Sequence, residues 1–150
     1  MTHCKMALIV LALLLVSSAA STQENGSGAA SDDLEAKIAS DPVLTRGAFV
    51  YNTCKVCHTI GPDERIVSGP DLTGIFDRVA ASDPNYGQYS LALKDFGIKW
   101  NAKALDDWLA NPYGFLPGNR MSFIGVQHPD DRAALIRYLK LFTSLPREAS

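Results

Sequence analysis

The sequence predicts an all-α domain whose helices are joined by long irregular loops. Apolar residues recur at helical spacing in several segments, and most of these segments begin at a capping residue or a proline. Strand-like alternation is weak throughout. Residues 61–87 and 112–125 are rich in Gly and Pro, and the first stretch exceeds the usual length of a structureless loop in a compact domain. Something other than regular secondary structure must therefore pack against these loops.

Residues 1–20 have the pattern of a signal peptide. Lys5 precedes the apolar run 6–16, and small residues follow this run. The run is shorter than the roughly 18 residues of a spanning helix. We therefore expect residues 1–20 to be removed on export, leaving no membrane span, with an uncleaved anchor as the alternative. Cys4 precedes the run, whereas a lipid-modified cysteine would follow it.

The remainder is long enough for one domain. Residues 21–40 are predicted to form a flexible extension, because residues 21–30 are small and polar and a helix over residues 33–40 would be marginal without packing. We place the domain at residues 41–145 and a C-terminal tail at residues 146–150.

The first two helices of the domain have clear boundary signals. Asp41-Pro42 supplies an N-cap acceptor and a proline for the first helical position of a helix that leads to the cysteines. Its inward face has helical spacing and consists of Leu44, Gly47, Ala48 and Tyr51. A short second helix is expected over residues 90–96 and ends at Gly97.

Two further helices follow. Asn101 caps one whose apolar face ends at Asn111-Pro112 and comprises Leu105, Trp108 and Leu109. The last helix begins at His128-Pro129 with two acidic residues in its first turn. Its apolar stripe comprises Leu135, Tyr138, Leu139 and Phe142.

The segment Cys54-Lys-Val-Cys57-His58 is the Cys-x-x-Cys-His pattern of covalent haem attachment. Two thiols one helical turn apart can add to two vinyl groups on one porphyrin edge, and the adjacent histidine can reach the iron. A zinc site is disfavoured because the exported chain would add only the distant His128. A thioredoxin-like pair lacks a βαβ context, and a plain disulfide would not explain the histidine. Haem would also give the long loops a surface to pack on.

Met121 is our candidate for the second axial ligand of the iron. It is the one methionine left after export, and it lies in an irregular loop that could present its sulfur. His128 is the competitor, but its place at a helix start favours a capping role. Met121 could instead fill a gap in the core.

These residues resemble the class I cytochromes c, close to the soluble bacterial and mitochondrial members. The resemblance covers about residues 41–143. The segments that carry it are Gly47-Ala-Phe-Val-Tyr51, Cys54-Lys-Val-Cys-His58, Gly69-Pro-Asp-Leu-Thr-Gly-Ile-Phe-Asp-Arg78, Tyr89-Ser-Leu-Ala92, Gly97-Ile-Lys-Trp100, Leu105-Asp-Asp-Trp-Leu-Ala-Asn-Pro112, Pro117-Gly-Asn-Arg-Met-Ser-Phe123 and Leu135-Ile-Arg-Tyr-Leu-Lys140. The resemblance implies the cytochrome c fold, in which helices and long loops wrap one covalently bound haem.

The resemblance also implies roles for further residues. The Pro70 carbonyl would accept the free ring N–H of the axial histidine. Arg78, Tyr89 and Trp100 would lie near a buried haem propionate. Gly47 would let the first and last helices of the domain approach closely, with Tyr51 packed against Leu135 and Tyr138.

Three features depart from the family pattern. Trp108 replaces a usual tyrosine near the methionine sulfur, and an indole donates but cannot accept a hydrogen bond. Asn119 replaces a usual threonine and could bond a propionate. The lysine ring of the mitochondrial members is not recognisable, with Lys55 and Arg120 the nearest basic candidates.

The predicted function is electron transport in the periplasm, without an enzymatic step, by a monomer that meets redox proteins as donor and acceptor. The chain has 14 basic and 16 acidic residues, which gives no sign of a nucleic-acid or anionic-membrane partner. Axial His and Met ligands raise the potential of haem iron. The alternatives are a peroxidase or gas-binding cytochrome with a labile Met121, and a subunit of a larger dehydrogenase or oxidase tethered by residues 21–33.

Overall fold

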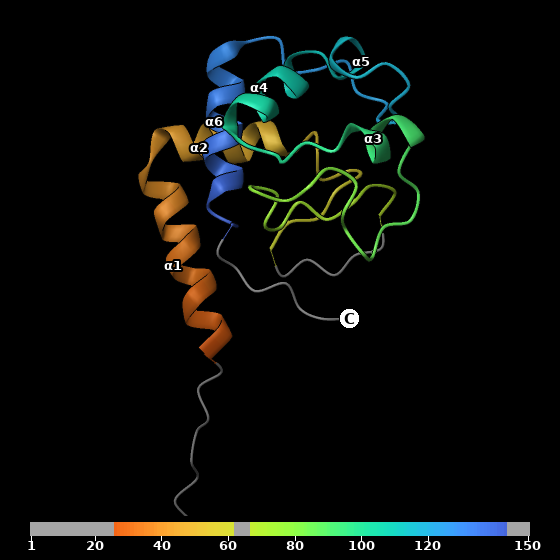
Figure 1. Cartoon of the computed structure of the whole chain (residues 1–150). Coiled ribbons are helices and arrows are strands. Elements are labelled where there is room, and N and C mark those ends of the chain that lie inside the picture. Colours follow the sequence, from red (N-terminus) through yellow and green to blue (C-terminus); the bar gives the residue numbers. More distant parts are fainter. Residues whose placement is uncertain (1–25, 62–66, 144–150) are drawn as a thin grey trace, which may run out of the picture.

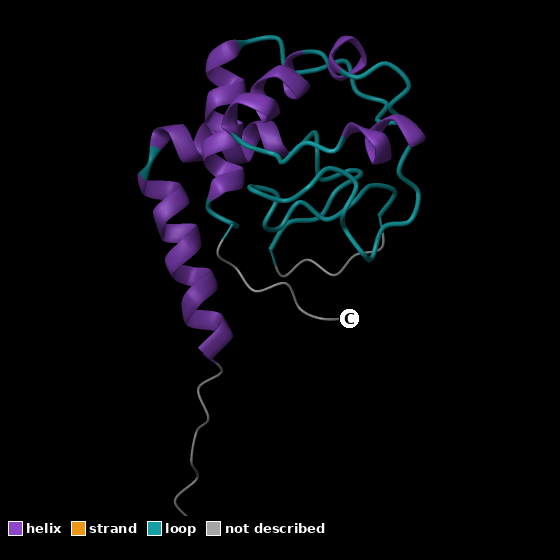
Figure 2. Cartoon of the chain, in the orientation of Figure 1, coloured by secondary structure: helices purple, strands orange, loops and turns teal. Residues whose placement is uncertain are grey.

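The computed structural model describes residues 26–61 and 67–143. The described residues form helices and loops without a strand, apart from one isolated antiparallel bridge between Val79 and Lys99. The helices are α1 (Gly26–Ser40), α2 (Pro42–Tyr51), α3 (Leu91–Phe96), α4 (Ala102–Ala110), α5 (Pro112–Phe115) and α6 (Pro129–Lys140). The all-α prediction is confirmed, and Figures 1 and 2 show α2, α4, α5 and α6 above the long loops, with α1 extending downward beside them. The predicted signal peptide and residues 146–150 lie outside the described residues.

α2 and α6 cross at a glycine. A Cβ built on Gly47 would lie 2.6 Å from the Tyr138 Cβ and closer still to the Ala134 carbonyl oxygen, so a side chain has no room there. The Tyr51 and Tyr138 rings pack with their centroids 5.5 Å apart. Leu135 of α6 is fully buried. This crossing, visible in Figure 1, fixes α2, and hence the cysteine turn after it, on α6.

Charged residues reinforce the crossing at its solvent edge. Asp41 caps α2 by accepting from the Val43 and Leu44 amides at 2.9 and 3.3 Å, and its other carboxylate oxygen accepts from Arg137 of α6 at 2.6 Å. Arg46 pairs with Asp131 at 2.7 Å. Exposed pairs of this kind contribute little to stability because solvent screens them, so they orient the helices more than they hold them together.

α1 occupies residues 26–40 of the segment predicted as a flexible extension, and residues 21–25 lie outside the described residues. The helix begins at Gly26 and continues to Ser40, and Figure 1 shows it leading away from the rest of the domain. Leu34 packs against the core, and the Thr45 hydroxyl of α2 donates to the Ile38 carbonyl at 2.8 Å. The marginal helix expected over residues 33–40 therefore has the packing it needed, and residues 26–32 continue it.

The boundary signals of α3 and α4 act as expected, whereas the side chain of His128 makes no capping hydrogen bond at the start of α6, contrary to the expected capping role. The Ser90 hydroxyl accepts from the Leu93 amide at the start of α3, and Gly97 ends that helix with φ of +67°. Asn101 caps α4 by accepting from the Ala104 amide at 2.9 Å. The sequence analysis missed α5, a single turn within a predicted loop. Its cap is Asn111, whose side chain accepts from the Gly114 amide at 2.9 Å.

The core joins α4 and α6 to residues of the long loops. Its buried apolar members include Leu44, Tyr51, Ile60, Ile75, Ala80, Trp100, Leu105, Trp108, Leu109, Ala134, Leu135, Leu139 and Phe142. Loop residues thus share one core with the helices. Among the described residues, no helix combines the length and the apolar character needed to cross a membrane.

Candidate functional site

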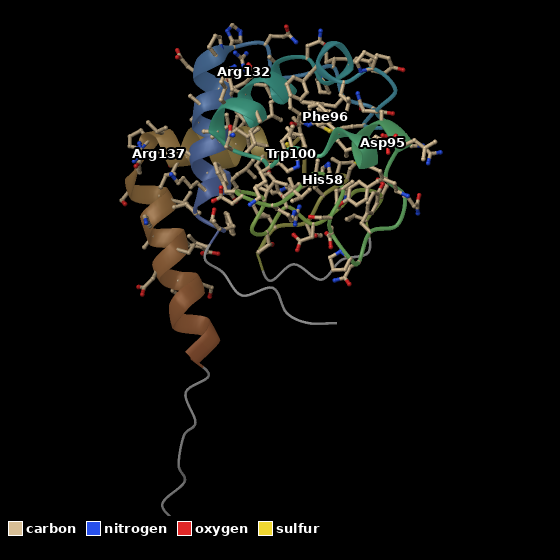
Figure 3. The ribbon with its side chains drawn as sticks, viewed as in Figure 1. His58, Asp95, Phe96, Trp100, Arg132 and Arg137 are labelled. Atoms are coloured by element: carbon tan, nitrogen blue, oxygen red, sulfur yellow. The ribbon has the colours of Figure 1, made fainter. Side chains whose placement is uncertain are left out.

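The helices and loops enclose a cavity of about 530 Å³, within the range of about 300–1,000 Å³ typical of cofactor and small-molecule sites. The turn after α2, the loop that follows it, α4, α6 and the connection between α5 and α6 all contribute to its wall. Figure 3 shows His58 and Trp100 in the interior of the domain. Every candidate site residue of the sequence analysis lines this cavity, namely Cys54, Cys57, His58, Pro70, Arg78, Tyr89, Trp100, Trp108, Asn119 and Met121.

The two thiols come from a tight turn at the C-terminal end of α2. The amides of Cys57 and His58 donate to the Cys54 carbonyl at 3.0 and 2.9 Å, which places both thiols and the histidine on one helical turn. Cys54 is half-buried and Cys57 is exposed, and no disulfide joins them. Burial raises the pKa of the Cys54 thiol.

The imidazole of His58 is fixed in one orientation and one tautomer. Its Nδ1 lies 2.7 Å from the carbonyl oxygen of Pro70, which can only accept, so Nδ1 carries the hydrogen and Nε2 keeps its lone pair. Burial lowers the pKa of His58, and the nearby Arg78 adds to this effect, so the ring is neutral. A neutral imidazole with a lone pair on Nε2 is a metal ligand held by an outer hydrogen bond.

Gly69 makes room for this histidine, and the sequence analysis did not single it out. A Cβ at Gly69 would lie 2.7 Å from Cε1 and 2.8 Å from Nδ1 of His58, and 2.6 Å from the Cys57 carbonyl oxygen. The Gly69 amide also donates to that carbonyl at 2.7 Å. Its place directly before Pro70 was the signal that could have identified it.

A polar wall of the cavity is formed by Arg78, Tyr89 and Trp100. The Arg78 guanidinium donates to the Asp71 and Thr73 carbonyls at 2.6 and 3.2 Å. The Trp100 amide donates to the Arg78 carbonyl at 2.9 Å, which holds these two residues side by side. A guanidinium, a phenol and an indole are all hydrogen-bond donors, so this wall suits an anionic group.

Aromatic and aliphatic side chains form the apolar wall. The Trp108 ring meets Trp100 edge-to-face at 5.5 Å and Phe115 at 6.1 Å between centroids. The aliphatic lining from α4 and α6 comprises Leu105, Leu109, Leu135 and Leu139. Such a wall favours a large planar apolar ligand.

Met121 reaches the cavity from the loop after α5, and Asn119 organises that loop. The Asn119 side-chain amide donates to the Pro112 and Leu116 carbonyls at 2.9 Å each, and its oxygen accepts from the Met121 amide at 2.9 Å. The predicted propionate contact of Asn119 would need amide hydrogens that are already donated to these carbonyls. His128, the competing ligand candidate, precedes α6 and is not among the cavity-lining residues.

The chain is similar in sequence to cytochromes of bacteria and plants. Cytochrome c2 from Rhodomicrobium vannielii is 38% identical over 104 residues, which cover 69% of this chain and 81% of the relative. Cytochrome c from Cannabis sativa is 39% identical over 99 residues, which cover 65% of this chain and 88% of the relative. The chain belongs to the class I c-type cytochromes. It is thus an electron carrier with one covalently attached haem c.

A structural comparison places this cytochrome in the same fold. Cytochrome cH from Methylobacterium extorquens matches with a TM-score of 0.60 and 34% sequence identity, over 65% of this chain and 96% of the other. No protein-family model matches the chain. The cytochrome c fold expected from the resemblance is confirmed.

The residues of the cavity fit a haem group. The volume and the aromatic wall suit a macrocycle, and the donor wall suits its carboxylates. Cys54 and Cys57 lie beside His58, whose Nε2 has the lone pair that iron requires. The cavity therefore offers covalent attachment, a nitrogen ligand and, from Met121, a sulfur ligand.

Proposed function

We propose that this cytochrome carries single electrons between periplasmic redox proteins, with its haem attached through Cys54 and Cys57 and its iron held by His58 and Met121. The observation that carries the proposal is the His58–Pro70 hydrogen bond of 2.7 Å at a cavity that Met121 also lines. It prepares one nitrogen of the histidine as a ligand, with a sulfur ligand available from another part of the wall.

Each residue has a defined part in this proposal. The haem supplies reversible one-electron chemistry at its iron. The Pro70 carbonyl increases the basicity of His58 and prevents rotation of the ring. Arg78, Tyr89 and Trp100 donate hydrogen bonds toward the haem carboxylates, which would otherwise be costly to bury. Electrons would pass at brief, small interfaces with partner proteins, and no substrate is converted.

The optical spectrum of the purified holoprotein tests the ligand pair. We expect a low-spin spectrum in both oxidation states and a weak sulfur-to-iron band in the ferric protein. Met121→Ala should abolish that band and give a high-spin ferric spectrum or a new ligand. Met121→His is the matched control, because it should lose the band yet stay low-spin. A high-spin wild type that binds carbon monoxide readily would favour the peroxidase or gas-binding alternative.

Covalent attachment and location need separate experiments. Acidified solvent should leave the haem on the wild-type chain and extract it from Cys54→Ala/Cys57→Ala.

The mass of the protein recovered from the periplasm should show whether residues 1–20 have been removed, whereas a full-length, membrane-bound protein would favour the uncleaved anchor. Gel filtration at physiological salt should give a monomer, and co-purification with a large enzyme would favour the tethered-subunit alternative.

A further inference from the structure

The side chain of Asn119 makes three hydrogen bonds at the centre of the loop that carries Met121. The residue is 6% exposed. Its two amide hydrogens go to the carbonyls of Pro112 and Leu116, and its oxygen accepts from the amide of Met121, with all three distances at 2.9 Å. Each bond joins the side chain to the backbone, so Asn119 holds the backbone conformation of this loop.

The two carbonyls that accept from Asn119 lie at the two ends of α5. Pro112 is the first residue of that helix and is fully buried, and Leu116 is its C-cap. α5 is itself held in the domain by Phe115, which packs edge-to-face against Phe96 at 5.4 Å and Trp108 at 6.1 Å. Asn119 thus connects a turn that is anchored by aromatic packing to the backbone of Met121.

The rest of the loop has little regular structure to hold it. Between α5 and α6 the described chain has no helix or strand, and Gly118 has φ of +86°, a conformation that few other residues adopt. The Met121 carbonyl accepts from the Phe123 amide at 2.9 Å, which is a contact within the same loop. The Asn119 amide is therefore the side-chain link between the Met121 backbone and α5.

We propose that Asn119 is a positioning residue that holds Met121 at the haem cavity and thereby sets how readily this methionine yields to competing iron ligands. This positioning role rests on the proposed function, in which Met121 is an axial ligand of the iron, and Asn119 would maintain that ligation. The residue does this through the backbone of Met121 and makes no direct contact with iron.

The expected effect follows from the bonds that would be lost. Asn119→Ala leaves the Met121 amide without its acceptor, whereas the Pro112 and Leu116 carbonyls lose the side-chain donor but keep the backbone amides of Leu116 and Asn119. When such a bond forms only in the methionine-ligated loop, its loss favours ligand exchange by up to about tenfold. For three bonds that are partly replaced by water, we expect about a 10- to 100-fold rise in the affinity of the ferric protein for azide.

The experiment compares Asn119→Ala and Asn119→Thr with Asn101→Ala. Asn101 is the control because it also bonds a backbone amide, but at the exposed start of α4. Asn119→Thr keeps one hydroxyl, which can replace part of the bonding, so its azide affinity should lie between those of wild type and Asn119→Ala. Asn101→Ala should bind azide as the wild type does. The pH at which the sulfur-to-iron band disappears should fall in the same order.

Hydrogen exchange gives a readout that does not depend on added ligands. The Met121 amide should lose about tenfold or more of its protection in Asn119→Ala, because its acceptor is gone. The amides of α4 should be affected in Asn101→Ala instead. A residue that only contacted a propionate would alter the potential while leaving azide affinity and Met121 exchange unchanged.

The outcomes separate this proposal from the proposed function. A wild type without the sulfur-to-iron band would overturn the ligation by Met121 itself. A wild type with the band, and Asn119 variants that match Asn101→Ala in azide affinity and in Met121 exchange, would overturn the positioning role alone. If Asn119→Ala does not fold, the comparison of Asn119→Thr with Asn101→Ala decides, and a several-fold rise in azide affinity is then required.

Discussion

Replacement of Gly69 by alanine tests whether the close packing of residue 69 on His58 fixes the orientation of the imidazole ring. The added methyl carbon would lie 2.6 Å from the Cys57 carbonyl oxygen and 2.7 Å from Cε1 of His58. None of these atoms is the end of a flexible chain: one is backbone, and the ring is tied to Pro70 by a hydrogen bond of 2.7 Å. The ring or the backbone must therefore move.

The magnitude can be estimated from two effects. Overpacking of a well-filled site costs about 1–3 kcal/mol, and weakening one hydrogen bond costs about 0.5–1.5 kcal/mol. We expect Gly69→Ala to lower the free energy of unfolding of the holoprotein by about 2–4 kcal/mol in urea denaturation. A changed spectrum of the haem ligand field should accompany the loss.

The matched control is Gly87→Ala. A Cβ at Gly87 meets no atom within 4 Å, so this variant should unfold within about 0.5 kcal/mol of the wild type. If Gly69→Ala unfolds at the same urea concentration as Gly87→Ala and keeps the wild-type spectrum, the close packing of Gly69 on His58 does not constrain the site.

Three further predictions concern the frame of the domain. Gly47→Ala should lower the free energy of unfolding by about 1–3 kcal/mol in urea denaturation, because its methyl meets α6 at 2.6 Å, and Gly87→Ala again serves as control. Arg78→Lys should lower the free energy of unfolding by about 1–3 kcal/mol in the same assay, since an ammonium cannot reproduce the forked donation to two carbonyls. An unchanged urea midpoint would show that one of these two hydrogen bonds is dispensable. Arg46 lowers the pKa of Asp131 below 3.8, so the pair stabilises the fold above that pH and the contribution disappears as the pH falls through the lowered value. Arg46→Ala should accordingly raise the pKa of Asp131 toward 3.8 in a carboxyl NMR titration, and an unmoved pKa would refute the pairing.

Local signals predicted the helices that have strong caps. Asp41 and Asn101 each accept the backbone hydrogen bond that their position in the sequence suggested. The same reasoning missed α5, because a single turn depends on contacts with distant residues such as those of Phe115 with Trp108 and Phe96. It also began α1 too late, at residue 33 instead of Gly26.

Some residues of the site could be predicted from the sequence, whereas the roles of others depend on contacts between distant residues. Spacing alone identified the cysteines and His58, because the chemistry of attachment needs adjacent residues. The close fit of Gly69 depends on a ring eleven positions earlier in the chain, and spacing cannot reveal it. For Asn119 the residue was identified, but the sequence suggested a ligand contact where the structure has three bonds to backbone.

α6 contacts both α2, which leads to the cysteine turn, and the end of the loop that carries Met121. On one side Gly47 fixes α2, and so the cysteine turn, against α6. On the other side Arg132 of α6, labelled in Figure 3, donates to the carbonyls of Val126 and Gln127 at 3.0 and 3.2 Å and pairs with Asp106 of α4 at 2.7 Å. The cysteine turn and the end of the Met121 loop therefore both lie against one helix. If His58 and Met121 hold the iron as proposed, a displacement of α6 would disturb both ligand-bearing segments together.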